Sequence, residues 1–380
     1  PARRLETVLV TGATGFVGSR IVHELLARST LRVVCSGRAA SDAAARIRVI
    51  EALVDKGLWQ PQFASRLEVY AGDLARERVG LSAALWDDLA ERCDLIVHNG
   101  ALVNFLFDYR AHRGANVLGT HELLRLALAR CPKPLHYVST LGVLDCEAAR
   151  RAEPLPEAFD PGEAVMPGSG YSRSKWVAER FLLDARRHGA LITVVRLGEV
   201  MPSADNGHPN PHALTHFLLS AFHALGLVPD APLRSDYTPV DHAAARVAAS
   251  VLDREAWGRT LHVFHPRTVA FEEVLAQAGA PLERVSCSEF LARLERAVAL
   301  TPERDLVTLR ALLPQGGQDE RALRSAFAGL LVDNPRLFRS DVCRGFEARW
   351  DLRDEELGPA IEAYRGYLAR HAARSRAHSG

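Results

Sequence analysis

Short runs of apolar and β-branched residues alternate with amphipathic, helix-like stretches through the first two-thirds of the chain. The runs predict strands at Thr7–Val10, Arg32–Ser36, Leu67–Tyr70, Leu95–His98, Leu135–Ser139, Leu191–Val195 and Leu261–Phe264. The stretches between them predict helices at Val17–Arg28, Ala43–Lys56, Val117–Arg130 and Ser174–Arg187. Alternating strands and helices form a parallel sheet covered by helices, and strands buried on both faces are almost wholly apolar. The pattern therefore predicts an α/β fold with a doubly wound parallel sheet.

The pattern changes after Leu197. Residues 202–232 are rich in proline around one apolar helix near Leu214–Leu225, and the chain beyond Pro266 has only helical spacing. The helices predicted there are Phe271–Ala278, Ser288–Leu300, Asp319–Leu331 and Leu357–Arg370. We expect a sheet domain over residues 1–200, completed by about 235–265, and a smaller, mostly helical substrate-binding lobe over 201–234 and 266–380.

Composition and charge limit the classes of partner. Of the 380 residues, 48% are apolar and 24% are charged, and the formal net charge is +1, so no strong overall field attracts nucleic acid or a membrane. The six cysteines are widely spaced with no CxxC pair, which is typical of reduced thiols in a cytosolic protein. No apolar run approaches the ~18 residues of a membrane span. We expect a soluble, cytoplasmic protein.

A glycine-rich turn follows the first predicted strand. The sequence TGATGFVG has glycines at 12, 15 and 18 and leads into a predicted helix, which is the context that gives such a motif meaning. Gly12 permits a tight turn, Gly15 lets the backbone approach a pyrophosphate, and Gly18 lets the helix pack against the strand. The sheet domain is therefore predicted to be a Rossmann-type nucleotide-binding domain.

The end of the second predicted strand favours NADP(H). Ser36-Gly37-Arg38 carries no acidic residue for a ribose 2′-hydroxyl, whereas Arg38 can pair with a 2′-phosphate, assisted by Arg46 and Arg48. A solvated arginine is the alternative, because the chain is rich in arginine. Asp73, after the third strand, is expected to face the adenine, and the turn at 99–101 is expected to lie under the ribose.

A tyrosine and a lysine stand four residues apart in Tyr171-Ser-Arg-Ser-Lys175, on one face of a predicted helix, in a chain with only three lysines. A nearby ammonium stabilises a phenolate and lowers the tyrosine pKa from about 10, so that the phenol can exchange a proton with a reacting oxygen. Ser139 and Thr140 end the fifth strand, where a hydroxyl can polarise a substrate carbonyl. The alternative is a packed tyrosine beside a surface lysine.

Together these motifs resemble the extended short-chain dehydrogenase/reductases. The likeness covers TGATGFVG, GDL at 72–74, HNGA at 98–101, NVLGT at 116–120, VST at 138–140, YSRSK at 171–175 and RLG at 196–198. The resemblance implies a catalytic triad of Thr140, Tyr171 and Lys175, with Ser139 as the less favoured hydroxyl. The predicted cofactor-binding residues are Thr11, Gly12, Thr14, Gly15, Phe16, Val17, Gly18, Arg38, Arg48, Asp73, Leu74, Asn99, Gly100, Ala101, Asn116, Lys175, Leu197 and Gly198.

Further motifs resemble one subfamily, the thioester reductase (R) domains that end non-ribosomal peptide and polyketide synthetases and carboxylic acid reductases. They include LVNF at 102–105, KPLHYVST at 133–140, GYSRSKWVAE at 170–179 and TPVD at 238–241, within residues 5–265. The resemblance implies NADPH-dependent reduction of an acyl or peptidyl thioester on a carrier protein's phosphopantetheine, to an aldehyde or onward to a primary alcohol. The start at Pro1 suggests a domain of a larger synthetase. The chain departs from the pattern at MPSADNGHPN (201–210), where family members often carry a GDSxTG-like turn.

Two rival functions remain open. A different extended reductase, acting on a soluble acyl-CoA, a nucleotide sugar or another carbonyl substrate, would share the catalytic residues. A non-catalytic NADP(H)-binding scaffold could use the same fold but has no need of the Tyr171–Lys175 pair. A hydrolytic thioesterase is excluded, because Gly168-Ser-Gly170 lacks one residue on each side of the serine to form a GxSxG elbow.

Histidines and arginines of the second region have weaker interpretations. His208, His212, His216 and His223 lack an HExxH motif, and prolines at 209 and 211 keep His208 out of a helix, so no metal site is predicted. They line a substrate channel or simply pack. Arginines in the C-terminal lobe suit an acidic carrier protein, or are solvated helix faces.

Overall fold

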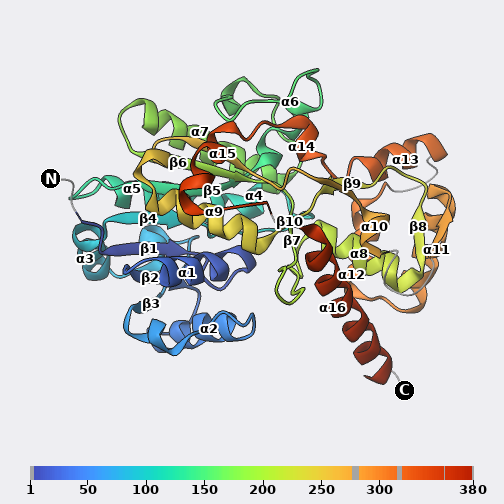
Figure 1. Cartoon of the computed structure of the whole chain (residues 1–380), viewed down its shortest axis with the longest axis horizontal. Coiled ribbons are helices and arrows are strands. Elements are labelled where there is room, and N and C mark those ends of the chain that lie inside the picture. The colour runs from blue at the N-terminus through green and yellow to red at the C-terminus, as the bar shows by residue number, and fades with distance from the viewer. Residues whose placement is uncertain (1–3, 276–281, 315–318, 355, 379–380) are drawn as a thin grey trace. The chain divides into compact units, whose positions relative to one another are not determined.

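The computed structural model describes residues 4–275, 282–314, 319–354 and 356–378, and it divides into two compact units (Figure 1). Unit 1 comprises residues 1–198, 241–263 and 337–353, and unit 2 comprises 199–240, 264–336 and 354–380. No helix among the described residues is long and apolar enough to cross a membrane.

Unit 1 contains a seven-stranded sheet in the order β11-β6-β5-β4-β1-β2-β3, in which every neighbouring pair is parallel. The predicted α/β, doubly wound fold is therefore confirmed. The strands are β1 (Thr7–Thr11), β2 (Arg32–Gly37), β3 (Leu67–Ala71), β4 (Leu95–His98), β5 (Leu135–Thr140), β6 (Ile192–Leu197) and β11 (Thr260–Val263). Each observed strand lies within two residues of its predicted bounds, because burial on both faces leaves a clear apolar signal.

Helices cover the sheet of unit 1. They are α1 (Phe16–Arg28), α2 (Asp42–Val54), α3 (Ala83–Arg92), α4 (Tyr109–His112), α5 (Gly119–Leu128), α6 (Asp145–Ala148), α7 (Gly170–Arg187), α9 (Val240–Leu252) and α15 (Asp341–Glu347). One core cluster joins Leu89 of α3, Leu126 of α5 and Leu182 of α7 to the sheet residues Ile96 and Val194, all of them almost fully buried. This packing fixes α7 against β5 and β6.

Unit 2 is mostly helical. Its helices are α8 (Leu214–Leu225), α10 (Phe271–Leu275), α11 (Cys287–Leu300), α12 (Arg304–Leu312), α13 (Glu320–Ala328), α14 (Asn334–Leu337) and α16 (Leu357–His378). Three buried rings organise its core: Phe290 makes edge-to-face contacts with Phe222 and with Phe327, each with ring centroids 5.4 Å apart. The predicted helix at Leu214–Leu225 is confirmed.

The prediction of a wholly helical region beyond Pro266 was wrong. Unit 2 contains short strand pairs: β7 (Val200–Met201) with β10 (Thr238–Pro239), β8 (Leu227–Pro229) with β13 (Glu283–Val285), and β9 (Arg234–Asp236) with β12 (Thr268–Ala270). Strands of two or three residues are too short to show a period of two. Residues 276–278 of one predicted helix lie outside the described residues.

The predicted lobe boundary also needs correction, since residues 337–353 belong to unit 1. A buried carboxylate explains the return: Glu157 accepts hydrogen bonds from the backbone N–H groups of Val342 (2.7 Å) and Cys343 (3.0 Å) at the start of α15. It also accepts one from the backbone of His262 on β11, at 3.3 Å. Burial raises the pKa of Glu157, and these N–H donors offset part of that effect.

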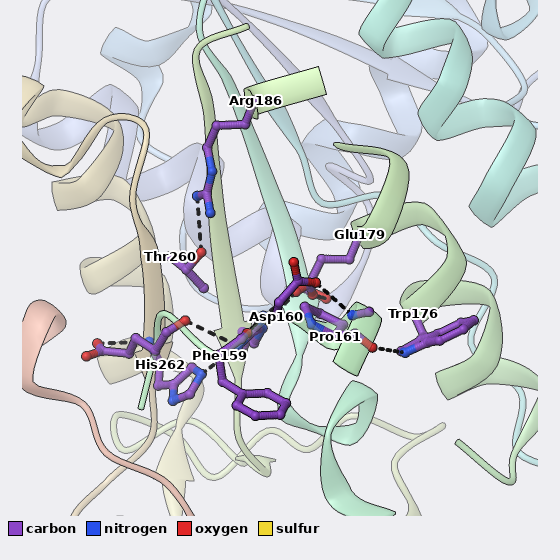
Figure 2. A network of polar contacts seen from close by, with 12 residues as sticks. Phe159, Asp160, Pro161, Trp176, Glu179, Arg186, Thr260 and His262 are labelled. Carbon is purple, nitrogen blue, oxygen red and sulfur yellow. Dashed lines mark hydrogen bonds and ion pairs between the residues drawn. The ribbon is translucent and has the colours of Figure 1, made fainter. Parts of the chain in front are cut away.

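A fully buried ion pair lies at the centre of the same network (Figure 2). Arg196 of β6 approaches Glu179 of α7 with Nη2 and Oε1 2.6 Å apart, and the second carboxylate oxygen accepts from Ser139 of β5 at 2.7 Å. Arg196 Nη1 lies 3.0 Å from Nε2 of His262. Because a guanidinium only donates, His262 accepts there and donates through Nδ1 to the carbonyl of Arg339, at 2.7 Å. The pair thus links α7, the sheet and the returning segment.

Replacing Glu179 with glutamine is expected to destabilise the protein strongly. The substitution leaves the Arg196 charge buried without an opposing charge, and breaking such a pair from one side costs roughly 3–5 kcal/mol. Chemical denaturation of the parent and of Glu179→Gln measures this loss. Glu91→Gln is the control, because Glu91 forms only an exposed pair with Arg130, 4.0 Å apart, and its loss should cost less than about 1 kcal/mol. Equal effects of the two substitutions would contradict the role of the buried pair.

Candidate active site

The candidate site begins where β1 and β4 lie side by side at the centre of the sheet. The chain leaves β1 toward β2 on one side, and it later continues from β4 toward β5 on the other. In a doubly wound sheet the carboxyl ends of such strands leave a crevice that binds nucleotides. The turns after β1 and β4, which contain Gly12 and Gly100, meet at this point.

The turn after β1 is packed too closely for side chains. Gly12 has a φ of +76°, and a Cβ on it would lie 2.6 Å from the Cα of Gly100. A Cβ on Gly18 would lie 2.0 Å from the carbonyl oxygen of Gly12 and 2.7 Å from the side-chain nitrogen Nδ2 of Asn99. Only glycine therefore fits at positions 12 and 18, and this packing brings α1, β1 and the turn after β4 together.

The amino end of α1 can receive an anion. Its N-cap residue is Gly15, so no side chain caps the helix, and its first turn contains no acidic residue. Gly15 is exposed, at the tip of the turn. The first backbone N–H groups of a helix have no partner within the helix, and the helix dipole favours negative charge there. The turn from Thr11 through Thr14 and the residues Phe16 and Val17 thus fit a cofactor pyrophosphate.

A chain of hydrogen bonds fixes the floor of the crevice. The two ring nitrogens of His98 each lie 2.8 Å from a hydroxyl, Nδ1 from Thr11 and Nε2 from Thr120. Thr120 donates to the carbonyl of Asn116 at 2.6 Å and so accepts from His98. Thr11 accepts from the backbone of Gly100 at 3.1 Å and keeps its own proton for a further partner. Burial, with the nearby Lys175 charge, lowers the pKa of His98 well below its usual value, so the imidazole is neutral. Because Nε2 then carries the ring proton, Nδ1 accepts from the Thr11 hydroxyl.

Of the residues predicted to select NADP(H), Arg38 and Arg48 meet just after the end of β2, whereas the Arg46 guanidinium does not. The Arg38 side chain is exposed, while the Arg48 guanidinium donates to the backbone carbonyl of Arg38. Arg46 donates instead to the carbonyls of Leu67 and Ala64, so it supports the start of β3. Of Arg38, Arg46 and Arg48, the latter two donate to backbone carbonyls, so Arg38 is the best placed to bind a 2′-phosphate.

The other predicted cofactor residues lie along the same edge of the sheet. Asp73 follows β3, and its carboxylate accepts from the backbone of Ala75 at 3.0 Å. Leu74 packs against two glycines: a Cβ on Gly100 would meet its side chain at 2.8 Å, and one on Gly119 would meet its carbonyl at 2.6 Å. Asn99, Gly100 and Ala101 follow β4, Leu197 ends β6, and Gly198 donates to the carbonyl of Val263 at 2.9 Å.

Asn116 connects α7 to the turn after β4. It lies in a π-helical turn, and its side-chain amide makes two hydrogen bonds with the backbone of Leu102, at 2.7 and 2.9 Å. It also donates to Ser174 Oγ at 2.9 Å, and Ser174 in turn donates to the carbonyl of Tyr171 at 2.7 Å. Asn116 thus holds the first turn of α7, although it was predicted from a cofactor motif.

Tyr171 and Lys175 lie in the first two turns of α7, which Ser169 caps by accepting from the backbone of Ser172 at 3.0 Å. Lys175 is buried: its Nζ donates to the carbonyl of Val138 at 2.6 Å and lies 4.0 Å from the ring centre of Tyr137. Burial lowers the pKa of Lys175 to about 7, and the Glu179 carboxylate opposes this shift. Because the ammonium has lost its hydration, the charge state of Lys175 depends strongly on nearby charged groups such as Glu179.

The two hydroxyls that end β5 have different surroundings. Ser139 is buried and donates to Glu179, as described above. Thr140 is half-buried, and its hydroxyl accepts from the backbone of Gly142 at 3.1 Å, which leaves its own proton available. The geometry therefore favours Thr140 over Ser139 as the group that can donate to a substrate oxygen.

Sequence reasoning missed three residues that support the site: Glu179, Ser174 and His98. Glu179 stands four residues after Lys175 on the same helical face, and that spacing was the available signal. His98 stands within the HNGA motif, but its role depends on hydroxyls 22 and 87 residues away. Only the fold brings such partners together.

The histidines of unit 2 have separate partners. The ring of His208 contacts that of Tyr367, His212 lies 2.7 Å from Arg304, and His216 lies 2.9 Å from the hydroxyl of Tyr364. Among the described residues, no group of three or more histidines, cysteines or carboxylates is arranged to hold a metal ion. Several arginines of this unit are opposed by carboxylates, such as Arg293 by Glu283 at 2.9 Å.

The chain is similar to known proteins. A family model described as "Male sterility protein", an NAD-binding model, matches residues 10–247. The chain is 37% identical over 293 residues to an isonitrile lipopeptide synthase of Streptomyces coeruleorubidus, covering 76% of this chain and 20% of that protein. It is 33% identical over 291 residues to a linear gramicidin synthase of Brevibacillus parabrevis, covering 76% of this chain and 6% of that protein. The chain thus spans a small part of these relatives.

A solved structure is similar over almost the whole chain. The terminal R domain from the myxalamid polyketide–peptide synthetase pathway superposes with a TM-score of 0.85 at 29% sequence identity. The match covers 98% of this chain and 92% of that one. The likeness therefore includes the helical unit, for which the sequence patterns were least informative.

The buried Lys175 ammonium is expected to make stability depend on pH. Its pKa is about 7 in the folded chain and 10.5 in the absence of burial, so between these values the unfolded chain binds more protons. The free energy of unfolding of the parent should then rise with pH, by at most about 1.4 kcal/mol per pH unit from this group. Lys175→Met lacks this contribution, so the parent should gain roughly 2 kcal/mol relative to it between pH 7.5 and 9.5.

Chemical denaturation at several pH values measures this difference. Tyr171→Phe is the matched control, because it keeps the ammonium and should retain the pH slope of the parent. Parallel pH curves for the parent and Lys175→Met would contradict a strongly desolvated lysine.

Proposed function

Because the chain belongs to the NAD-binding family of the male sterility protein and is similar throughout to thioester reductase domains, we propose that it reduces an acyl or peptidyl thioester to an aldehyde. The chain is an oxidoreductase of the short-chain dehydrogenase/reductase type. We propose Thr140, Tyr171 and Lys175 as its catalytic residues and NADPH as its reductant. Unit 1 is proposed to bind NADPH, and unit 2 is proposed to bind part of the substrate.

One observation carries the proposal: Lys175, one helical turn after Tyr171 on α7, is buried against the end of β5, the strand that Thr140 ends. Lys175 is held by the carbonyl of Val138, one residue before Ser139. The close packing at Gly12 and Gly18 sets the turn, and the amino end of α1, which no side chain caps, can offer backbone N–H groups to phosphate oxygens. A scaffold that only senses the cofactor has no use for a desolvated lysine beside a tyrosine.

NADPH is supported by the surroundings of β2. Position 38 carries a guanidinium, which pairs well with a phosphate and poorly with a ribose hydroxyl. The side chain is exposed, and Arg48 holds the backbone of residue 38 from the following helix. When bound, the reduced nicotinamide supplies a hydride to the thioester carbon.

The protein's own groups act on the carbonyl oxygen. Tyr171 and Thr140 donate hydrogen bonds to this oxygen, which gains negative charge as the carbon becomes tetrahedral. Tyr171 then transfers its proton to the oxygen, and the Lys175 ammonium stabilises the phenolate that remains. The product of this step is a hemithioacetal, whose C–S bond breaks to give an aldehyde and a free thiol. No covalent bond to the protein is required.

The proposed substrate is held on a carrier protein. The synthetases and the R domain that the chain resembles are, by their names, parts of peptide and polyketide assembly lines. In such enzymes the acyl group is attached through phosphopantetheine. Reduction then releases the product, and a second round would convert the aldehyde to a primary alcohol.

The direct test follows oxidation of the nicotinamide at 340 nm, with the same acyl group presented on a carrier protein and on coenzyme A. We expect aldehyde or alcohol, identified by mass spectrometry, with NADPH preferred over NADH and the carrier over coenzyme A. Tyr171→Phe should lower turnover by about 10²–10⁴ while NADPH affinity changes little, because the phenol acts on the substrate oxygen.

The outcomes separate the candidate functions. Equal use of coenzyme A would favour an acyl-CoA reductase. Cofactor binding without oxidation on either thioester would contradict the proposal, and full turnover by Tyr171→Phe would contradict the assigned proton donor.

A further inference from the structure

Exposed apolar side chains occur in two segments next to the amino end of α7, one that precedes the helix in sequence and one whose backbone packs against Gly170. Twelve large apolar side chains are exposed among the described residues, and five of these lie in two short segments. Val103 (36% exposed), Leu106 (50%) and Phe107 (48%) lie in the loop after β4. Val165 (37%) and Met166 (50%) lie in the segment that leads into α7. We call these five residues the apolar lip.

The loop that carries Leu106 and Phe107 is firmly held. At its start, the backbone N–H and carbonyl of Leu102 both form hydrogen bonds with the side chain of Asn116. Further along, Asn104 Oδ1 accepts from the backbone of Leu106 (2.9 Å) and of Phe107 (3.2 Å). A Cβ on Gly170, the first residue of α7, would lie 2.4 Å from the carbonyl oxygen of Phe107. The loop backbone is therefore packed against the catalytic helix while its apolar side chains remain in water, which is an unfavourable arrangement in the absence of a partner.

The lip continues to the catalytic tyrosine through ring contacts. The ring of Phe105 lies 6.0 Å from that of Tyr171, edge to face. On the other side, the buried ring of His112 lies 6.0 Å from Tyr171 and 6.3 Å from Phe107. A substrate carbonyl must come within about 3 Å of the Tyr171 hydroxyl. One of the two substituents on the carbonyl carbon can then extend from Tyr171 across these rings toward the lip.

We propose that the apolar lip binds the acyl chain of the thioester and that the preferred substrate carries an apolar chain of medium length. This inference rests on the proposed function. The other substituent of the carbonyl, the pantetheine arm, contains two amides, which lose hydrogen bonds when they are buried against apolar groups. The five lip side chains offer no hydrogen-bonding group, so they match an alkyl chain and disfavour the pantetheine arm.

The test is a chain-length series of acyl N-acetylcysteamine thioesters with two to eight carbons. Full transfer of a methylene from water favours binding about fourfold, and a half-exposed lip should give about twofold per methylene in kcat/KM. Leu106→Ser should flatten this dependence, with a loss of about tenfold on the octanoyl substrate and less than twofold on acetyl. Leu128→Ser is the matched control: Leu128 is 49% exposed, at the end of α5, and its substitution should leave the series unchanged.

A binding measurement separates this proposal from the proposed function. Titration calorimetry with alkyl thioether analogues of the same lengths, in which a methylene replaces the thioester carbonyl so that nothing can be reduced, reports contact with the lip without turnover. Affinity that rises with chain length in the parent and not in Leu106→Ser supports the lip even if no thioester is reduced. The proposal is overturned if turnover and affinity are independent of chain length. It is also overturned if Leu106→Ser lowers activity equally at every length, or only with carrier-bound substrates, which would instead make the lip a carrier contact.

Discussion

The structure of the site depends on one buried ammonium. Lys175 is covered by the sheet, donates to the carbonyl of Val138 at 2.6 Å and lies over the ring of Tyr137. Its burial is unfavourable for folding, because a lone ammonium loses its hydration, and the pKa falls to about 7 as a result. The surrounding protein tolerates this group because Glu179 supplies an opposing charge one turn further along the helix. In the proposed mechanism the same desolvation strengthens the effect of the ammonium on Tyr171, since a charge acts more strongly in a dry environment.

Two close-packed arrangements keep that ammonium in register with the cofactor site. Glu179 is itself fixed by Arg196 and Ser139, so α7 cannot shift along β5 and β6 without breaking a buried ion pair. On the other side, Asn116 connects α7 to the turn after β4, and that turn packs against Gly12 with no space for a Cβ. Tyr171, the proposed proton donor, and the predicted phosphate site are therefore parts of one rigid arrangement within unit 1. This rigidity suits a reaction in which two groups must meet one carbonyl.

The sequence was sufficient for those features that depend on local pattern. Seven strands, the glycine turn and the Tyr171–Lys175 spacing follow from burial, turn chemistry and helical periodicity, each read over a few residues. The short strands of unit 2 carry no such period, and the return of residues 337–353 to unit 1 depends on Glu157, about 180 residues earlier. The choice between Ser139 and Thr140 likewise required the position of Glu179. What sequence patterns could not supply were pairings between distant segments. The roles of Thr140, Arg38 and the other cofactor residues remain predictions.

The central claim is that hydride reaches the carbon of a thioester at this site. The most direct measurement uses NADPH deuterated at both C4 positions, a carrier-bound acyl thioester and mass spectrometry of the released product under single-turnover conditions. The account predicts an aldehyde that contains one deuterium, located on the carbonyl carbon, together with free carrier thiol. Release of a carboxylic acid, or of an aldehyde without deuterium, would contradict it.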